Sequence, residues 1–229
     1  MRTFASSADA ISYLQATYGS SNYNSWQVTR WQFFSFSPFA SAGVGQLPLF
    51  GNVAGVAGAT QQLTNIPKAN SFGQQHFLVK AIRCAYQIND PKFAETNYLG
   101  TDATTFASEI VNGIFQSGYL ELSILAKPFL QLPLPFLMAP PASGDSILLT
   151  NGLTAAVIGN RPVAELNGDR DDLFLLEPEI LIEAENNFSI SYNWPSGVVP
   201  LIATSIVNDA TNPLNLGVIL DGILFRPTQ

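Results

Sequence analysis

The sequence predicts an all-β fold, a sandwich or a barrel, from the patterns of three segments. Over residues 188–194 (FSISYNW), large apolar side chains alternate with Ser and Asn, which is the period of a strand with one buried and one solvated face. We therefore interpret residues 173–194 as one long strand segment and residues 214–229 as another. Residues 77–88 (FLVKAIRCAYQI) are apolar at nearly every position and rich in β-branched and aromatic side chains, as in a strand buried on both faces.

An N-terminal arm with a short helix is expected before the first strand. Ser7 is placed to cap this helix, and Gly19 is placed to end it. The apolar residues that recur at helical spacing are Ile11, Leu14 and Tyr18. The sequence thus divides into an arm over residues 1–25 and a single domain over residues 26–229.

The domain is expected to open with a strand over residues 26–36 (WQVTRWQFFSF), which is dense in aromatic residues and closed by Pro38. Residues 40–59 are rich in Gly, Ala and Val. They do not fit a phosphate-binding loop because no Gly-Lys-Ser/Thr follows them. A loop or an extended arm packed on a neighbouring molecule is the expectation for this stretch.

The middle of the chain combines one inserted helix with further strands. Residues 105–115 show apolar side chains at helical spacing, and residues 119–127 alternate like a half-buried strand. Residues 128–141 carry five prolines, which favours an edge strand or a surface loop. Additional short strands are predicted over residues 146–150, 154–158 and 200–207.

Composition restricts the classes of partner. Charged residues make up only 12% of the chain against 47% hydrophobic residues, so apolar surface must be covered, most simply by other subunits. The net charge is −7 and no cluster of Lys and Arg occurs, which argues against direct binding to nucleic acid. The N-terminus shows no apolar signal sequence, and prolines interrupt the most apolar stretch, 125–141, so we expect synthesis in the cytoplasm and no transmembrane helix.

The residues that enzymes commonly use are scarce. His76 is the only histidine, and no Gly-x-Ser-x-Gly motif occurs, so no enzymatic activity and no cofactor are expected. A hydrogen-bonding or surface role is the more economical interpretation of His76. The lone cysteine, Cys84, is expected to be a buried apolar side chain rather than part of a disulfide.

Acidic and aromatic side chains are the remaining candidates for a site. A turn with the sequence NGDRDD offers carboxylates for calcium at Asp169, Asp171 and Asp172, although it lacks the spacing of the known calcium loop. The glutamates at positions 177, 179, 183 and 185 are expected to mark the solvated face of a strand. Trp26, Trp31 and Trp194 are candidates for a sugar-binding platform, but all three lie within or next to strand patterns, and core packing is the preferred interpretation.

Four segments carry a family resemblance. They are LTNIPKANSFGQQHFLVKAIR at 63–83, LELSILAKPFLQLPLPFL at 120–137, EPEILIEAENNFSISYNWP at 177–195 and LGVILDGILFRPTQ at 216–229. Together they resemble the jelly-roll capsid proteins of small tail-less icosahedral bacteriophages, some of which enclose a membrane. The resemblance implies a single jelly roll of about eight antiparallel strands in two packed sheets.

The same resemblance implies a function and partners. It points to a virion structural protein, most simply a capsid protein that self-assembles into an icosahedral shell, as trimers or higher oligomers and with other virion proteins. An acidic chain without a basic arm further suggests that a membrane or another protein separates it from the genome. The residues expected at subunit contacts are Phe129, Leu130, Leu132, Leu134, Phe136 and Leu137. The alternative is a carbohydrate- or receptor-binding β-sandwich, such as a vertex spike or a lectin-like module.

Overall fold

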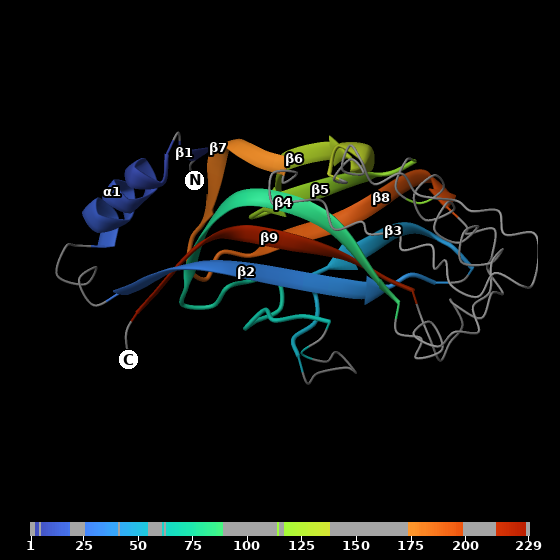
Figure 1. Cartoon of the computed structure of the whole chain (residues 1–229), viewed down its shortest axis with the longest axis horizontal. Helices are drawn as coiled ribbons and strands as arrows, with labels where there is room; N and C mark the ends of the chain where they lie inside the picture. Colours follow the sequence, from blue (N-terminus) through green and yellow to red (C-terminus); the bar gives the residue numbers. More distant parts are fainter. Residues whose placement is uncertain are drawn as a thin grey trace, which may run out of the picture.

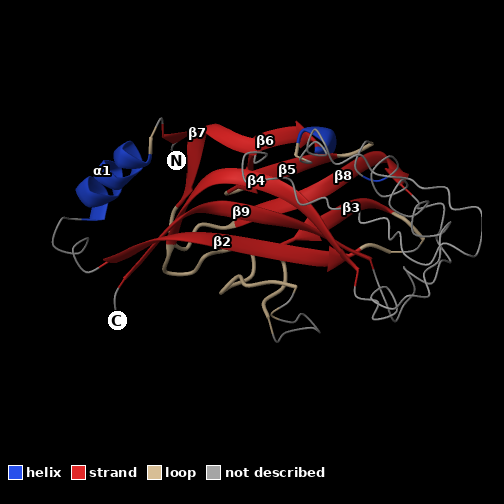
Figure 2. Ribbon diagram, in the orientation of Figure 1, coloured by secondary structure: helices blue, strands red, loops and turns tan. Residues whose placement is uncertain are grey.

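Two antiparallel β-sheets make up most of the computed structural model, and one helix, α1 (Ser7–Tyr18), lies at one end (Figures 1 and 2). The structure describes residues 3–4, 6–18, 26–40, 42–54, 61, 63–88, 114, 117–137, 174–198 and 214–227. The prediction of an all-β sandwich with an N-terminal helix is confirmed.

The first sheet, sheet A, contains the longest strands. Its order is β1 (Thr3–Phe4), β7 (Phe174–Ile182), β4 (His76–Ile88), β9 (Leu214–Pro227) and β2 (Trp26–Pro38). The second, sheet B, has the order β3 (Val44–Leu49), β8 (Phe188–Val198), β5 (Tyr119–Ile124) and β6 (Lys127–Pro133), and the short 3-10 helix η3 (Leu134–Phe136) follows β6.

The strand pairs are nested around the hairpin of β5 and β6. In that hairpin Ile124 pairs with Lys127, and the two turn residues between them, Leu125 and Ala126, both have positive φ, as a tight hairpin turn requires. Moving outward from this turn, β4 pairs with β7, β3 with β8 and β2 with β9. Each strand before the hairpin therefore pairs with the strand at the matching position after it.

The main core lies between the two sheets. Phe188, Ile190, Tyr192 and Trp194 are all buried, which confirms the alternation expected for 188–194. Rings from outside the strand also pack on them: Phe72 stacks on Phe188 with ring centroids 4.7 Å apart, and Phe39 meets Trp194 edge-on at 5.7 Å. Such aromatic contacts join loops and strands that are far apart in sequence.

Strand β4 is buried on both faces, as its composition predicts. Phe77 and Val79 face the core between the sheets, whereas Leu78 packs on the other side against α1. A bulge between Val79 and Ala81 shifts the alternation by one residue, so that Ile82 faces the core.

One expectation, a single long strand over residues 173–194, is wrong. The chain leaves sheet A after β7, turns through residues 183–187 and enters sheet B as β8. Glu185 has a positive φ in this turn, and its backbone N–H donates to the carbonyl oxygen of Gly73 at 2.7 Å. The glutamate series is therefore divided: Glu177 and Glu179 lie on β7, while Glu183 and Glu185 lie in the turn.

Part of the Gly-rich stretch also differs from its prediction as a loop or arm. Residues Val44–Leu49 form β3, which among the described strands pairs only with β8 and is an edge strand of sheet B. Because an edge strand has one unpaired side, Pro48 fits within it without disrupting the ladder. The proline-rich stretch after residue 127 follows the same logic, since β6 is the other edge of sheet B and the edge strand expected there is confirmed.

The helix predicted over residues 105–115 lies outside the described residues except for Ile114, which is buried and whose carbonyl oxygen accepts a hydrogen bond from Trp194 Nε1 at 2.7 Å. The strands predicted over residues 146–150, 154–158 and 200–207 also lie outside the described residues.

Candidate interaction surface

The outer face of sheet A is partly covered by α1, which seals a second, smaller core. Ala10 and Leu14 of α1 are fully buried against Leu78 of β4, Leu181 of β7 and Phe225 of β9. The helix thus joins three strands of the sheet through apolar contact, and the predicted spacing of Ile11, Leu14 and Tyr18 marks the face that makes it.

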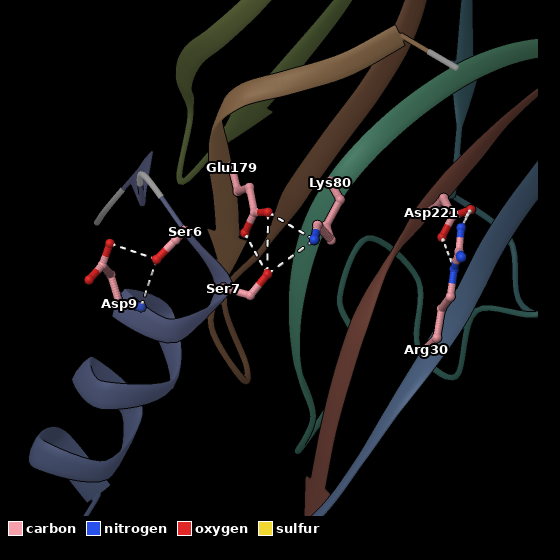
Figure 3. A network of polar contacts seen from close by, with 7 residues as sticks. All are labelled: Ser6, Ser7, Asp9, Arg30, Lys80, Glu179 and Asp221. Carbon is pink, nitrogen blue, oxygen red and sulfur yellow. Dashed lines mark hydrogen bonds and ion pairs between the residues drawn. The ribbon is translucent and has the colours of Figure 1, made fainter. Parts of the chain in front are cut away.

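The first turn of α1 is fixed by two serines with different roles. Ser6, rather than the predicted Ser7, caps the helix: its Oγ accepts from the backbone N–H of Asp9 at 3.3 Å and lies 2.9 Å from the Asp9 carboxylate. Ser7 points instead to the sheet, where its Oγ lies 3.2 Å from Glu179 Oε2 and accepts from Lys80 Nζ at 3.1 Å (Figure 3). Lys80 and Glu179 form an ion pair at 3.1 Å, so this small network ties α1 to β4 and β7.

Beside this network the sheet surface is hollowed. An open hollow of about 430 Å³ lies on the outer face of sheet A between Lys80 and Asp221. Asp221 forms a second ion pair with Arg30, whose Nη2 atom is 2.9 Å from Oδ2 of Asp221. Figure 3 shows this pair and Lys80. The lining of the hollow combines apolar side chains, among them Val28, Leu175 and Ile223, with these charges. The hollow therefore presents a mixed surface, with its cations already paired to carboxylates.

Asp221 is the buried member of the second ion pair. Burial by itself would raise the pKa of its carboxyl, but hydrogen bonds from Arg30 and Gln32, together with the charges of Arg30 and Arg83, outweigh burial and hold the pKa below its usual value. Asp221 consequently stays ionised near neutral pH and orients the exposed Arg30 along β2.

His76 lies under α1 rather than at a solvent-accessible site. Its Nδ1 accepts from the backbone N–H of Ala184 at 3.1 Å, and its ring meets the ring of Tyr18 edge-on, with centroids 4.7 Å apart. Burial lowers the pKa of the imidazole to about 4, although the nearby Glu183 carboxylate acts in the opposite direction. Of the two roles expected for His76, these contacts agree with hydrogen bonding, whereas its burial contradicts a surface role.

The six residues predicted at subunit contacts fall into three groups. Phe129, Leu130 and Leu132 of β6 are partly buried and pack against the main core. Leu134 and Leu137 are buried in that core, so they offer no surface to a neighbour and the expectation for these two is corrected. Phe136, which is 66% exposed, remains a strong candidate for an external contact.

Three exposed apolar side chains lie on sheet A, and one of them is Trp31, a candidate from the sequence analysis. Val28 and Trp31 on β2 are 42% and 45% exposed, and Leu175 on β7 is 61% exposed. The exposure of Trp31 corrects the core packing expected for it. The exposure of Val28 and Leu175 depends on the tertiary arrangement, which the sequence pattern does not give. Trp194, by contrast, is buried in the core and cannot stack on a sugar.

Other predicted site residues add no cluster. Asp169, Asp171 and Asp172 lie outside the described residues, as does the side chain of Trp26. Within the described ranges, no group of His, Cys, Asp and Glu is arranged to hold a metal ion. Cys84 is partly buried beside the core, and burial raises the pKa of its thiol to about 12.

Across the described part of the chain, none of the helices is both long and apolar enough to cross a membrane. Neither a scan of protein-family models nor comparisons with curated proteins and solved structures gives a match to this chain.

Proposed function

We propose that this protein is a virion structural protein with a jelly-roll fold, a capsid subunit that self-assembles into an icosahedral shell. The observation that carries the proposal is the order of the strands. A jelly roll is an eight-stranded double sheet, formed when an antiparallel ribbon of strand pairs is wrapped so that successive pairs fall in alternate sheets.

Numbering the strands from β2 to β9 as one to eight makes the comparison direct. Wrapping such a ribbon gives the order one, eight, three, six in one sheet and two, seven, four, five in the other. The observed orders β2-β9-β4-β7 and β3-β8-β5-β6 agree with both, and β1 is added as a fifth strand of sheet A. This agreement supports a single roll over residues 26–229, preceded by the arm of residues 1–25.

Jelly rolls occur in viral capsid proteins, in lectins and in cupins. The cupin type holds its metal with several histidines, and this chain has one, His76, which is buried beneath α1. A capsid role fits a chain with few charges and with exposed Val28, Leu175 and Phe136 on its surface, because permanent subunit interfaces are larger and more apolar than transient ones.

Assembly of the purified chain tests this proposal. Sedimentation velocity over a range of concentration and salt, followed by electron microscopy of the fast-sedimenting fractions, is expected to reveal trimers, larger rings or closed particles. A strictly monomeric chain at every concentration would contradict a self-assembling shell protein.

The position of the protein in the virion follows from its charge. The acidic chain offers no basic arm to packaged nucleic acid, so we propose that a membrane or another protein lies between it and the genome. Ultraviolet cross-linking of intact virions would detect direct contact, and abundant cross-links from this chain to nucleic acid would contradict that arrangement.

A carbohydrate- or receptor-binding module is the second candidate, and the exposure of Trp31 favours it, because an exposed indole offers a stacking surface for sugar rings. A glycan array probed with the wild-type chain and with Trp31→Phe and Trp31→Ala separates the two functions. Sugar binding that Trp31→Phe keeps and Trp31→Ala loses would favour the binding module.

A further inference from the structure

Three of the four strands at the sheet borders carry features that prevent pairing with another molecule. β1 is only two residues long, β3 contains Pro48 and pairs with β8 in an irregular register, and β6 contains Pro128 and Pro133 together with a bulge at Phe129. Short strands, prolines and bulges are the devices by which proteins protect exposed strand edges. The fourth border strand is β2, which lies beside β9 (Figure 1). It is thirteen residues long and has neither a proline nor a bulge before Pro38.

The backbone groups on the free side of β2 can be identified from the groups that are paired there. The backbone N–H of Phe34 donates to Asn65 Oδ1 at 2.8 Å, and the N–H of Phe36 donates to the carbonyl oxygen of Leu63 at 2.7 Å. Because the pairing of β2 with β9 has no register shift, the even-numbered residues present their N–H and C=O groups to the free side along the whole strand.

The first half of this edge is open among the described residues. Residues 63–65 cover the second half of the edge through Leu63 and Asn65. Asn65 also donates from Nδ2 to the carbonyl oxygen of Gln32 at 2.8 Å, which is the last contact of this segment toward the N-terminal end of β2. Beyond it, the N–H of Gln32 and both backbone groups of Arg30 and Val28 have no partner in the described structure. The exposed side chains of Val28 and Trp31 flank this stretch.

We propose that the open edge of β2, residues 26–32, pairs with the same edge of a second copy of this chain, which joins the two sheets A into one continuous sheet across a two-fold axis. This inference goes beyond the capsid role and does not depend on it. Backbone groups that need partners and apolar side chains beside them are the two features that strand addition uses.

Two conditions set the register of the pair. Backbone groups on the free side of one copy must lie opposite backbone groups on the free side of the other, and like charges must not lie opposite each other. An antiparallel pair centred on Thr29 sets Val28 opposite Arg30 of the second copy and Arg30 opposite its Val28, so that all four residues exchange backbone hydrogen bonds through their free groups. Centring the pair on Arg30 would also place free backbone groups opposite each other. However, it would set two guanidinium groups directly opposite each other, which is destabilising.

The register centred on Thr29 is further supported by its side chains. Thr29 faces Thr29 of the second copy at the axis, and Thr–Thr is a favourable cross-strand pair. Trp31 then faces Gln27 of the other copy, which covers part of the exposed indole. Arg30 keeps its bond to Asp221 on the outer face, so pairing leaves no cation without its carboxylate.

Cysteine cross-linking tests this register. At a position opposite its own copy, where the two residues do not exchange hydrogen bonds, the Cα atoms lie about 4.5 Å apart, within the range of a disulfide. Under mild oxidation, Thr29→Cys is expected to give disulfide-linked dimers. Gln27→Cys on the same face is the matched control, since its thiols would lie about 13 Å apart along the strand. Wild type, with Cys84 alone, gives the background.

A proline variant tests whether the backbone edge causes the association. Val28→Pro removes an N–H that faces the free side, which edge strands tolerate, and it is expected to raise the dimer dissociation constant at least about tenfold. Val28→Thr, which keeps the N–H and the branched shape, should associate like wild type. Far-UV circular dichroism and the thermal midpoint verify that both variants are folded.

The outcomes separate this inference from the proposed function. Edge pairing would be overturned by equal cross-linking of Thr29→Cys and Gln27→Cys, or by equal association of folded Val28→Pro and Val28→Thr. Particles that form undiminished from Val28→Pro would also overturn edge pairing, but they would leave the capsid role intact. Dimers that depend on Val28 but never assemble further would sustain the edge pairing and contradict the shell.

Discussion

Mild acid should weaken the folded state through His76, because the imidazole is buried beneath α1 with little room for a charge. Its Nδ1 accepts a hydrogen bond from Ala184 N–H, so protonation at that atom also removes a backbone partner. Tyr18 covers the ring from α1, and Glu183 is the nearby carboxylate whose charge opposes the effect of burial on the pKa. The perturbation is a change of pH from 7 to 5.

The size of the effect follows from the pKa of His76, which burial lowers from 6.5 to about 4. The unfolded chain takes up a proton near pH 6.5, whereas the folded chain does so only near pH 4, so the unfolded state binds more protons between these values. The stabilisation is complete above pH 6.5 and is lost as the pH falls toward 4. Between pH 7 and pH 5 the expected loss in the free energy of unfolding is about 2 kcal/mol.

Urea denaturation at pH 7 and pH 5 measures this loss, with His76→Asn as the control. Asn keeps an oxygen near the position of Nδ1 but does not titrate, so the variant should lose about 2 kcal/mol less than wild type between the two pH values. Other groups titrate equally in both proteins and cancel in the comparison. Identical losses in wild type and His76→Asn would refute the burial argument.

Three further variants test packing and hydrogen bonding by urea denaturation at pH 7. Leu14→Ala should cost about 2–5 kcal/mol because Leu14 is fully buried in the smaller core. Gln15 is exposed, so Gln15→Ala should change stability by less than about 0.5 kcal/mol, and equal effects of the two variants would contradict the packing of α1. Gly222→Ala should cost about 1–3 kcal/mol or more, since an added Cβ would lie 2.0 Å from the backbone oxygen of Leu78 in β4. Gly51→Ala is the control, because its Cβ meets nothing within 4 Å. A tolerated Gly222→Ala would show that the backbone of β4 relaxes freely at this point. Tyr192→Phe removes the hydroxyl that donates to the carbonyl oxygen of Gly217 and should cost about 0.5–1.5 kcal/mol, so a neutral result would mean that this buried bond contributes nothing.

The elements that sequence reasoning located well are those whose burial repeats along the chain. The alternation of residues 188–194, the doubly buried β4 and the helical spacing of α1 each follow from local pattern, and each agrees with the structure. The single strand expected over residues 173–194 failed because its break depends on Glu185, whose N–H is held by Gly73, a residue distant in sequence. Periodicity alone carries no information about such a contact.

The candidate surface was harder to predict than the fold. Leu134 and Leu137 belong to an apolar stretch that looks exposed in sequence because prolines divide it, yet the 3-10 turn after β6 directs both into the core. The open edge of β2 was missed for the opposite reason. Val28 and Trp31 lie in a strand whose composition does not show its place in the sheet. Only the strand order shows that one side of this strand has no neighbouring strand among the described residues.

The nesting of the strands has a consequence for how the chain folds. Its outermost pair brings together residues as far apart as Gln27 and Arg226, whose side chains are hydrogen-bonded although 199 positions separate them. Contacts of such long sequence separation slow folding, because the entropy of closing the intervening loop is lost before the contact forms. β9 lies between β4 and β2, so these two strands have unsatisfied edges until it arrives. We therefore expect sheet A to close only after β9 has left the ribosome, and the hairpin of β5 and β6 to form first.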